Sequence, residues 1–294
     1  MRLIGFIIIY PLLWLLSILP LNFLYFISDT FLYPIVYYLI KYRRNVVFSN
    51  LRNAFPEKNN DEIKKIGKKF YKYFCHVLVE TIKLLHIPEQ EFKERIKFRN
   101  ANVLDELYSK GKSIIAVTGH YGNWEWLSGV ADRTPYKIVS LYKPLSNKYI
   151  EKVLTEIRTR FGAELVAMNQ TIRKMHEYDE KDQKILVCFI ADQTPIRSHI
   201  EYWTKFLNQD TPVFLGPEKV ARKFDMALLF TKIVPVKKGY YEVEFVKLYE
   251  SLNGVTNLEP TEAHIKELEK LVIEKPEYWL WTHRRWKHKK VKNV

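Results

Sequence analysis

Apolar residues recur with two different periods along the chain, and these periods predict alternating strands and helices. Short apolar runs typical of buried strands span residues 113–118, 137–142, 164–168, 184–191 and 226–235. Helical spacing predicts helices over residues 63–85, 150–161, 171–178, 217–224 and 261–274. Residues 240–248 alternate between apolar and polar positions, as an edge strand does. This order indicates an α/β domain with a largely parallel central sheet flanked by helices.

Start and stop signals set some helix boundaries. Asn59 to Glu62 open the first long helix with acidic residues in its first turn, and Pro88 ends it. Ser146 can cap the helix over residues 150–161, and Gly162 supplies the conformation in which such helices often end. The sequence has no internal repeat and no long linker, so these elements belong to one domain.

The N-terminal region has a different pattern. Residues 3–27 form 25 consecutive uncharged and mostly apolar positions, whereas a membrane-spanning helix needs roughly 20. A signal peptide has a shorter apolar region of about 7–15 residues and a cleavage site of small residues, which is missing at Phe26 to Asp29. Pro11 and Pro20 kink a helix. A retained anchor is therefore expected, either as a kinked span or as a helical hairpin in one leaflet.

A second apolar stretch over residues 31–40 ends at three basic residues within 41–44. Basic residues beside an apolar segment favour a cytoplasmic location for the chain that follows. We therefore expect a hydrophobic membrane anchor over residues 1–40 and one domain over residues 41–294 that includes a basic C-terminal tail.

The charge balance predicts an anionic partner. Lys and Arg number 47 against 33 Asp and Glu, which gives a net charge of +14, and such a surplus suits nucleic acid, an anionic membrane, a phosphorylated substrate or an acidic protein. Aromatic residues make up 15% of the chain, which fits a membrane interface or single-stranded nucleic acid. The apolar N-terminus and the lack of a nucleic-acid-binding motif favour the membrane. Cys75 and Cys188 lie in apolar patterns and form no disulfide framework.

The string GHYGNWEW, residues 119–126, directly follows the first strand of the domain. In open α/β sheets, functional groups collect past the carboxyl ends of strands. Five residues on a regular helix lie about 140° apart, so His120 and Glu125 meet only if a tight turn separates them. Gly122 supplies the backbone freedom for that turn, and Asn123 tolerates turn and cap geometry. We therefore expect the Glu125 carboxylate to fold back onto the His120 imidazole.

Such a pair has a chemical use. A carboxylate on one ring nitrogen fixes the tautomer and raises the basicity of the other nitrogen, which can then remove a proton from an attacking hydroxyl. No serine or cysteine lies beside His120 to be activated, so direct attack by a substrate hydroxyl on an activated acyl group is the natural hypothesis. The alternative is a purely structural hydrogen bond.

Three stretches together resemble a known family. His120-x4-Glu125 after a buried strand resembles the acyltransferase motif H-x4-D/E. Residues 44–57, RNVVFSNLRNAFPE, are similar to the segment that follows the N-terminal anchor in the late acyltransferases of lipid A biosynthesis. Residues 276–286, PEYWLWTHRRW, are similar to the C-terminal signature of the same bacterial membrane enzymes. The resemblance covers nearly the whole chain.

This resemblance implies a function and its site. Members transfer a fatty acyl chain from acyl carrier protein, or sometimes coenzyme A, to a hydroxyl of a lipid A precursor, with His120 as general base and Glu125 as its partner. The implied partners are the acyl donor, an anionic phosphorylated glycolipid and the membrane, and no metal or other cofactor is required. The implied location is the bacterial inner membrane, with the catalytic domain on the cytoplasmic side.

Two sequence features bear on the acceptor. Glu125 in place of Asp favours the lipid A branch over the glycerolipid branch, and residues 191–195, ADQTP, lack the E-G-T-R-like motif of the glycerolipid enzymes. The same segment also departs from the pattern of the enterobacterial lipid A enzymes. Another membrane lipid, such as a lysophospholipid or an aminolipid, stays open as the acceptor, and so does a non-catalytic membrane interaction protein.

Further residues are candidates for substrate binding. Lys143 ends a predicted strand and could meet a phosphate or the thioester carbonyl. Arg158 and Arg160 could clamp a phosphate, with Arg160 favoured because it lies closer to the loop. Asp192 follows a buried strand and could orient a basic residue or the acceptor, and Asn123 completes the set. The structural alternatives are a solvated lysine, basic residues at a helix end, and turn or cap residues.

Two further regions carry weaker signals. Residues 283–292 hold six Lys or Arg and suit a surface for anionic lipid or phosphate, with a solvated tail as the alternative. Trp124 and Trp126 flank Glu125 and could line an acyl channel, with core packing as the alternative.

Overall fold

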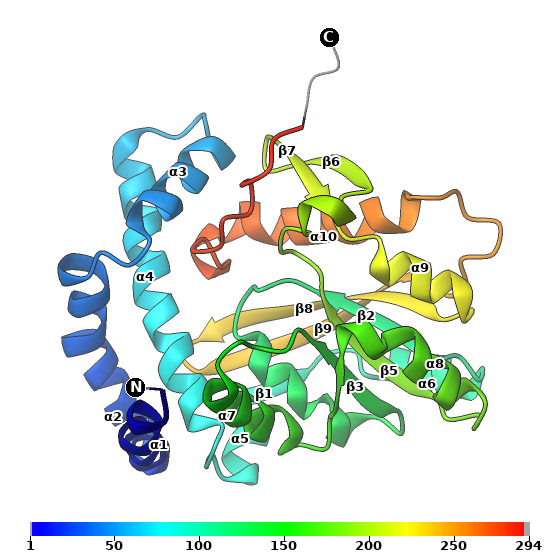
Figure 1. The fold of residues 1–294 in the computed structure, drawn as a ribbon, viewed down its shortest axis with the longest axis horizontal. Coiled ribbons are helices and arrows are strands. Elements are labelled where there is room, and N and C mark those ends of the chain that lie inside the picture. Colours follow the sequence, from blue (N-terminus) through cyan, green and yellow to red (C-terminus); the bar gives the residue numbers. More distant parts are fainter. Residues whose placement is uncertain (1, 291–294) are drawn as a thin grey trace.

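A seven-stranded sheet organises the domain (Figure 1). The structure, a computed structural model, describes residues 2–290, with side chains from Tyr10 onward. The strand order is β1 (Ile96–Phe98), β9 (Tyr240–Tyr249), β8 (Ala227–Lys237), β2 (Ile114–Thr118), β5 (Ile185–Ile190), β3 (Lys137–Tyr142) and β4 (Glu164–Ala167). Within this sheet, as far as the structure describes the chain, β8 and β9 pair antiparallel and the other neighbouring strands pair parallel. The largely parallel α/β sheet predicted from the sequence is thereby confirmed.

Helices cover both faces of this sheet, as the burial of β2 on both sides requires. Ile114 and Ala116 face one cluster, which includes side chains of α5 (Glu89–Arg95), α6 (Asn102–Ser109), the 3₁₀ helix η3 (Trp124–Arg133) and α7 (Lys148–Thr159). Ile115 and Val117 face the other cluster, which includes side chains of α8 (Thr171–Asp179) and α9 (Gly216–Lys223). On that side α10 (Glu259–Glu274) also contacts β2, β8 and β9.

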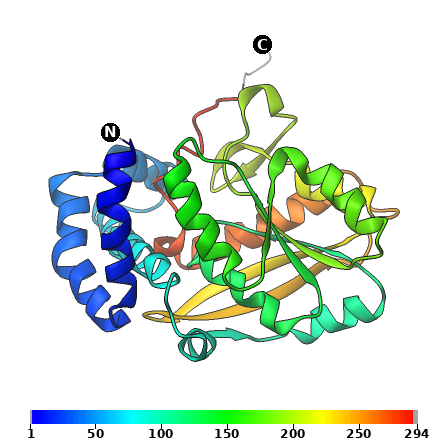
Figure 2. The same ribbon diagram turned by 60° about the horizontal axis from the view of Figure 1, so that its bottom comes forward.

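A separate hairpin and several short elements complete the chain. Strands β6 (Tyr202–Phe206) and β7 (Gln209–Val213) pair only with each other and stand apart from the main sheet (Figure 2). Short 3₁₀ helices are η4 (Met168–Gln170), η5 (Arg197–His199) and η6 (Pro276–Tyr278). The last of these packs against α4 and α10, so it brings the C-terminal segment toward the centre of the molecule.

The N-terminal third is helical and lies at one end of the sheet (Figure 1). Its elements are α1 (Arg2–Ile18), α2 (Leu21–Ile27), the π-helical turns η1 (Ser28–Leu32) and η2 (Ile35–Leu39), α3 (Arg44–Ala54) and α4 (Asn60–Lys83). The first four and α3 all pack against α4. Asn59 and Glu62 form a reciprocal capping box at the start of α4, which confirms the predicted opening.

The predicted membrane anchor is not found as a spanning helix. Among the described residues, no single helix is both long and apolar enough to cross a bilayer, and only the pair Leu21–Leu39 with Arg44–Ala54, bent by 83°, passes that test of length and composition. The division of the chain at residue 40 stays a prediction.

Three sequence expectations need correction. Asn147 rather than Ser146 caps α7, since its side chain accepts from the amides of the two residues after Lys148. Strand β9 alternates as predicted but is not an edge strand, because the three-residue β1 pairs with it on the outside. Helix α4 ends at Lys83, and Pro88 precedes α5 instead. Helices α3, α5 and α6 and the β6–β7 hairpin are not among the elements predicted from the periodicity.

Candidate active site

The segment after β2 forms the tight turn that the glycines predict. Gly122 has φ +63°, and a Cβ atom there would lie 2.5 Å from the carbonyl oxygen of Ile233, so both its conformation and its surroundings require glycine. The Gly122 amide donates to the carbonyl of Tyr278 at 3.0 Å. Helix η3 begins at Trp124, which places Glu125 in its first turn, as expected.

The His120 imidazole pairs with a carboxylate from the neighbouring strand. Its Nδ1 lies 2.6 Å from Oδ1 of Asp192, and the His120 backbone amide donates to Oδ2 at 2.8 Å. Strands β2 and β5 are parallel neighbours in which Thr118 is opposite Ile190. His120 and Asp192 each follow these partners by two residues, so the register of the sheet brings the two side chains together.

Asp192 is built to stay ionised. Its side chain is nearly fully buried and accepts a third hydrogen bond, from Nε1 of Trp279, at 2.8 Å. Burial raises the pKa of this carboxyl, but its electrostatic and hydrogen-bond interactions with His120 and the hydrogen bond from Trp279 outweigh burial and hold the pKa at about 2. Asp192 is therefore an anion at neutral pH that fixes the orientation of the imidazole.

Glu125 does not touch the imidazole, so the expected His120–Glu125 contact is wrong. Its carboxylate instead accepts two hydrogen bonds from the Arg158 guanidinium, at 2.8 Å and 2.6 Å. A planar guanidinium satisfies both carboxylate oxygens at once, and Nδ1 of His120 is already occupied by Asp192. Burial lowers the pKa of Arg158, but the hydrogen bonds and charge of Glu125 raise it more.

Trp124 connects this ion pair to the histidine. Its indole Nε1 donates to Oε1 of Glu125 at 3.1 Å, and its ring packs edge-on against the imidazole with centroids 4.7 Å apart. The Glu125–Arg158 pair therefore fixes Trp124, and Trp124 bounds one side of the imidazole.

Gln193 occupies the other ring nitrogen. Its Nε2 lies 3.2 Å from Nε2 of His120. With the ring proton on Nδ1 toward Asp192, Nε2 carries the lone pair and accepts this bond from the amide of Gln193. Gln193 and Trp279 were not predicted from the sequence as site residues. Gln193 lies in residues 191–195, which depart from the enterobacterial pattern, and Trp279 lies in residues 276–286, which resemble the C-terminal signature. The sheet register was the signal that could have placed Gln193 beside the histidine.

Comparison with known proteins adds the family to this geometry. A model of the bacterial lipid A biosynthesis acyltransferases matches residues 2–288. The chain belongs to this family. It is 24% identical over 281 residues to a lipid A biosynthesis palmitoleoyltransferase of Escherichia coli (strain K12), an alignment that covers 95% of this chain and 90% of that protein. A lipid A biosynthesis acyltransferase of Shigella flexneri aligns with the same identity and coverage. The chain is therefore an acyltransferase, and the family supports action on lipid A.

In this acyltransferase, the remaining candidate residues differ from one another in what they contact. Arg160 donates to the backbone carbonyls of Leu84 and Ile87 just after α4. It therefore ties down a helix end, whereas Arg158 contacts Glu125. A phosphate-binding role for either arginine stays a prediction. Asn123 is fully buried and donates to Glu80 at 2.8 Å, so it holds the turn in place. Lys143 is exposed just past β3, and its contact with a phosphate or thioester stays a prediction.

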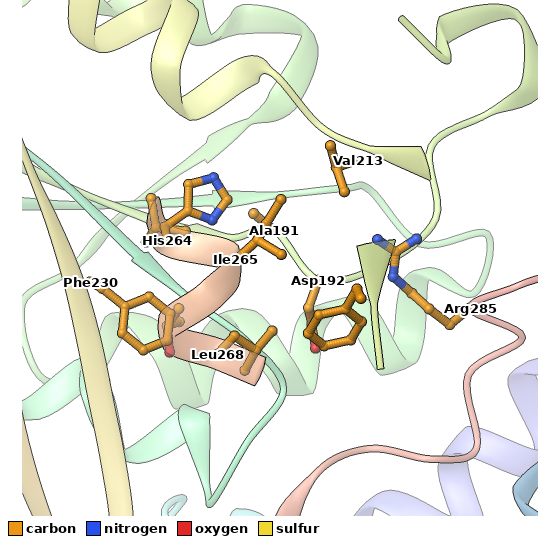
Figure 3. Close-up of a pocket in the computed structure, with 11 residues that line it drawn as sticks. Ala191, Asp192, Val213, Phe230, His264, Ile265, Leu268 and Arg285 are labelled. Carbon is orange, nitrogen blue, oxygen red and sulfur yellow. The ribbon is translucent and has the colours of Figure 1, made fainter. Parts of the chain in front are cut away.

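A small cavity lies behind Asp192 (Figure 3). Its volume of about 20 Å³ suits roughly one water molecule and is far too small for an acyl chain. Arg285 extends from the C-terminal segment to the end of the cavity that holds Asp192. Burial lowers the pKa of this guanidinium to about 10, while the charge of Asp192 raises it. The cavity therefore lies between Asp192, the partner of the His120 imidazole, and the charged Arg285.

The C-terminal segment is only partly the solvated basic tail that its composition suggests. Arg285 is 2% exposed, and the Trp286 indole donates to Thr211 Oγ1 at 2.7 Å. These contacts fold the start of the segment onto the site and the β6–β7 hairpin. Lys292, which the prediction of a basic surface included, lies outside the described residues.

Trp126 is a core residue. It is fully buried and stacks on Phe92 with ring centroids 5.1 Å apart, while Tyr241 packs against it at 5.4 Å. This packing favours the structural alternative over an acyl channel for Trp126. Trp124 is the tryptophan that borders the site.

Proposed function

We propose that this acyltransferase moves a fatty acyl chain from an acyl thioester to a hydroxyl of a lipid A precursor, with His120 as general base. The observation that carries the mechanism is the imidazole held between the Asp192 anion on Nδ1 and an amide donor on Nε2. An imidazole oriented in this way presents a lone pair where a substrate hydroxyl can replace the Gln193 amide.

The proposed reaction needs one attack and one departure. Nε2 of His120 takes the proton from the acceptor hydroxyl as its oxygen forms a bond to the thioester carbonyl carbon. The carbonyl oxygen carries the negative charge of the tetrahedral intermediate. The carbon–sulfur bond then breaks, and the imidazolium returns the proton to the departing thiolate. Asp192 stabilises the imidazolium throughout, because it is the anion that faces Nδ1.

Glu125 has a positioning role in this proposal. Its carboxylate contacts Arg158 and Trp124 rather than a reacting atom. The bidentate pair holds η3 against α7, and the Trp124 ring limits the rotation of the imidazole. This arrangement explains how a carboxylate five residues after the histidine serves the chemistry without touching the ring.

The N-terminal helices supply a surface for a membrane. Large apolar side chains are exposed there, among them Leu15, Phe26, Phe31, Leu39 and Ile40, with Leu39 76% exposed. Contiguous exposed apolar residues on a folded protein mark a contact with lipid or protein, and basic residues beside them suit an anionic leaflet. The proposed location is the cytoplasmic face of the bacterial inner membrane, where acyl carrier protein or coenzyme A delivers the acyl chain.

A transfer assay tests this proposal. The full chain is mixed with acyl carrier protein or coenzyme A thioesters and a lipid A precursor in detergent micelles, and the lipids are analysed by mass spectrometry. The expected product is the precursor with one added ester-linked acyl chain. A lysophospholipid serves as the competing acceptor. Transfer to the lysophospholipid alone, with every donor, would refute the proposed acceptor.

A further inference from the structure

A second cavity near the site lies between α4 and the turn that joins β8 to β9. It has a volume of about 290 Å³, and its lining includes Lys72, Tyr73, Lys237, Lys238 and Tyr241. The ammonium groups of the three lysines are hydrogen-bond donors, which suits oxyanions. Its volume is more than ten times that of the cavity behind Asp192.

Positive charge exceeds negative charge at the mouth of this cavity. Asp29 is the carboxylate that the lysines approach: Lys238 lies 2.9 Å from it and Lys72 3.7 Å. His76 also contacts Asp29, at 2.6 Å, but burial lowers the pKa of this imidazole, so it adds no positive charge to the count at neutral pH. Lys237 lies over the Tyr240 ring, 4.0 Å from the centroid. The three lysines therefore keep a surplus of positive charge after one carboxylate is counted.

The carboxylate that lines the cavity, Glu80, already has protein hydrogen-bond donors. Glu80 is buried and accepts hydrogen bonds from Tyr25, from Tyr241 and from Asn123. Burial raises its pKa, while these hydrogen bonds lower it. Glu80 is thus buried and held by three protein donors, whereas Lys72, Lys237 and Lys238 are exposed.

The cavity adjoins the turn that carries His120. Glu80 lines it and contacts Asn123 within that turn. Ile233 lies against Gly122, and Pro235, which lines the cavity, follows Ile233 by two residues along β8. Two residues of a strand span roughly 7 Å, so this part of the cavity lining lies close to the turn between β2 and η3.

An apolar surface borders the same place. Phe26 and Phe31, which flank Asp29 in the chain, are 57% and 55% exposed. A ligand that uses both features has an anionic headgroup and long apolar chains, so a water-soluble anion would satisfy only the lysines.

We infer that this cavity binds a phosphate group of the lipid acceptor and thereby sets the distance between that phosphate and the hydroxyl at His120. The inference rests on the proposed function and adds a subsite to it. Lys237 and Lys238 are the residues assigned to the phosphate, because both line the cavity and are exposed to an incoming headgroup.

The test compares a phosphorylated acceptor with the same acceptor after its phosphates have been removed. The variant Lys237→Gln/Lys238→Gln should raise KM for the phosphorylated acceptor about tenfold, as expected for the loss of two partly exposed charge pairs, with kcat changed less than about twofold. Lys237→Arg/Lys238→Arg should keep KM near its normal value. Lys181→Gln/Lys266→Gln removes two exposed lysines elsewhere and should change nothing. Equal KM values for the cavity and control variants would overturn the inference, and so would an equal loss with both acceptors.

A binding experiment separates this inference from the proposed function. In the His120→Ala background, which should not turn over, binding of the phosphorylated acceptor in micelles should weaken about tenfold with Lys237→Gln/Lys238→Gln. Charge-dependent binding without any acyl transfer by the wild-type protein would support the cavity and refute the proposed function. Phosphatidylglycerol micelles and inorganic phosphate are the competing probes. Equal lysine-dependent binding of either one would overturn assignment of the cavity to the acceptor.

Discussion

Two buried carboxylates near His120 have opposite surroundings. Asp192 and Glu125 are each 7% exposed, yet Asp192 accepts from the imidazole, from a backbone amide and from an indole, whereas Glu125 accepts from a guanidinium and an indole. Asp192 is 72 residues from His120 in the chain and touches it. Glu125 is five residues away and reaches it only through Trp124.

The difference shows that a sequence motif can identify the residues of a site without identifying which of them contact one another. The H-x4-E spacing places both residues at the site, because a tight turn and a short helix follow the strand. It does not decide which carboxylate meets the ring, since an arginine on a neighbouring helix competes for Glu125. The parallel register of β2 and β5 decides that contact.

Removal of the imidazole should have the largest effect. His120→Ala deletes the proposed base, and general base catalysis contributes about 10²–10⁴-fold, so the single-turnover rate of acyl transfer should fall by at least that factor. Circular dichroism and thermal unfolding check that the variant folds. Near-normal turnover in a folded variant would exclude His120 as the base.

Asp192→Asn should come next, with a loss of roughly 10²-fold. The substitution keeps the size of the side chain but removes the charge that stabilises an imidazolium and the acceptor that fixes the tautomer. The effect should appear in kcat, measured with saturating donor and acceptor, because the substrates do not contact Asp192 in the proposed mechanism. A loss confined to KM would instead indicate a substrate-binding role.

Glu125→Gln should cost less, about tenfold, near 1.4 kcal/mol of transition-state stabilisation. It weakens the hold on Trp124 but leaves the Asp192–His120 pair intact. Arg158→Gln should have a similar effect, and the double variant should be no worse than either single variant, because the two residues act as one unit. Additive losses would show that Glu125 and Arg158 act separately.

The sequence predicted the larger part of the fold and the strand-end turn that carries His120 and Glu125, whereas Gln193 and Trp279 were not predicted as neighbours of the histidine. The strands and helices after residue 112 carry strong periodicity, and Gly122 marks the turn because only glycine fits there. The contacts of Glu125 and Arg160 were not predictable, because they depend on how α7 packs against η3 and the end of α4. The burial of Arg285 was likewise hidden, since a run of basic residues alone suggests a solvated tail.

Glu80 is a third buried carboxylate, and its replacement by Gln should have the smallest effect of these substitutions. Burial raises its pKa, whereas the pKa of Asp192 is held low. When folding raises the pKa of a carboxyl, the folded protein becomes less stable as pH rises above the ordinary pKa of that carboxyl. The reason is that the group ionises first in the unfolded chain. The Glu80→Gln variant has no such pH-dependent loss. Its free energy of unfolding should therefore rise relative to that of the wild type as the pH increases from 4.5 to 8. Urea unfolding at both ends of that range measures the difference, and a difference independent of pH would contradict the assigned environment.

The most direct test asks whether the His120 imidazole is hydrogen-bonded to Asp192. Proton NMR of the full chain with ¹⁵N-labelled histidine reports the downfield resonance of the His120 Nδ1 proton, which a short hydrogen bond to a carboxylate produces. We expect this resonance in the wild-type protein and in Glu125→Gln, and we expect Asp192→Asn to abolish it. A resonance that survives Asp192→Asn and disappears in Glu125→Gln would contradict the pairing of His120 with Asp192.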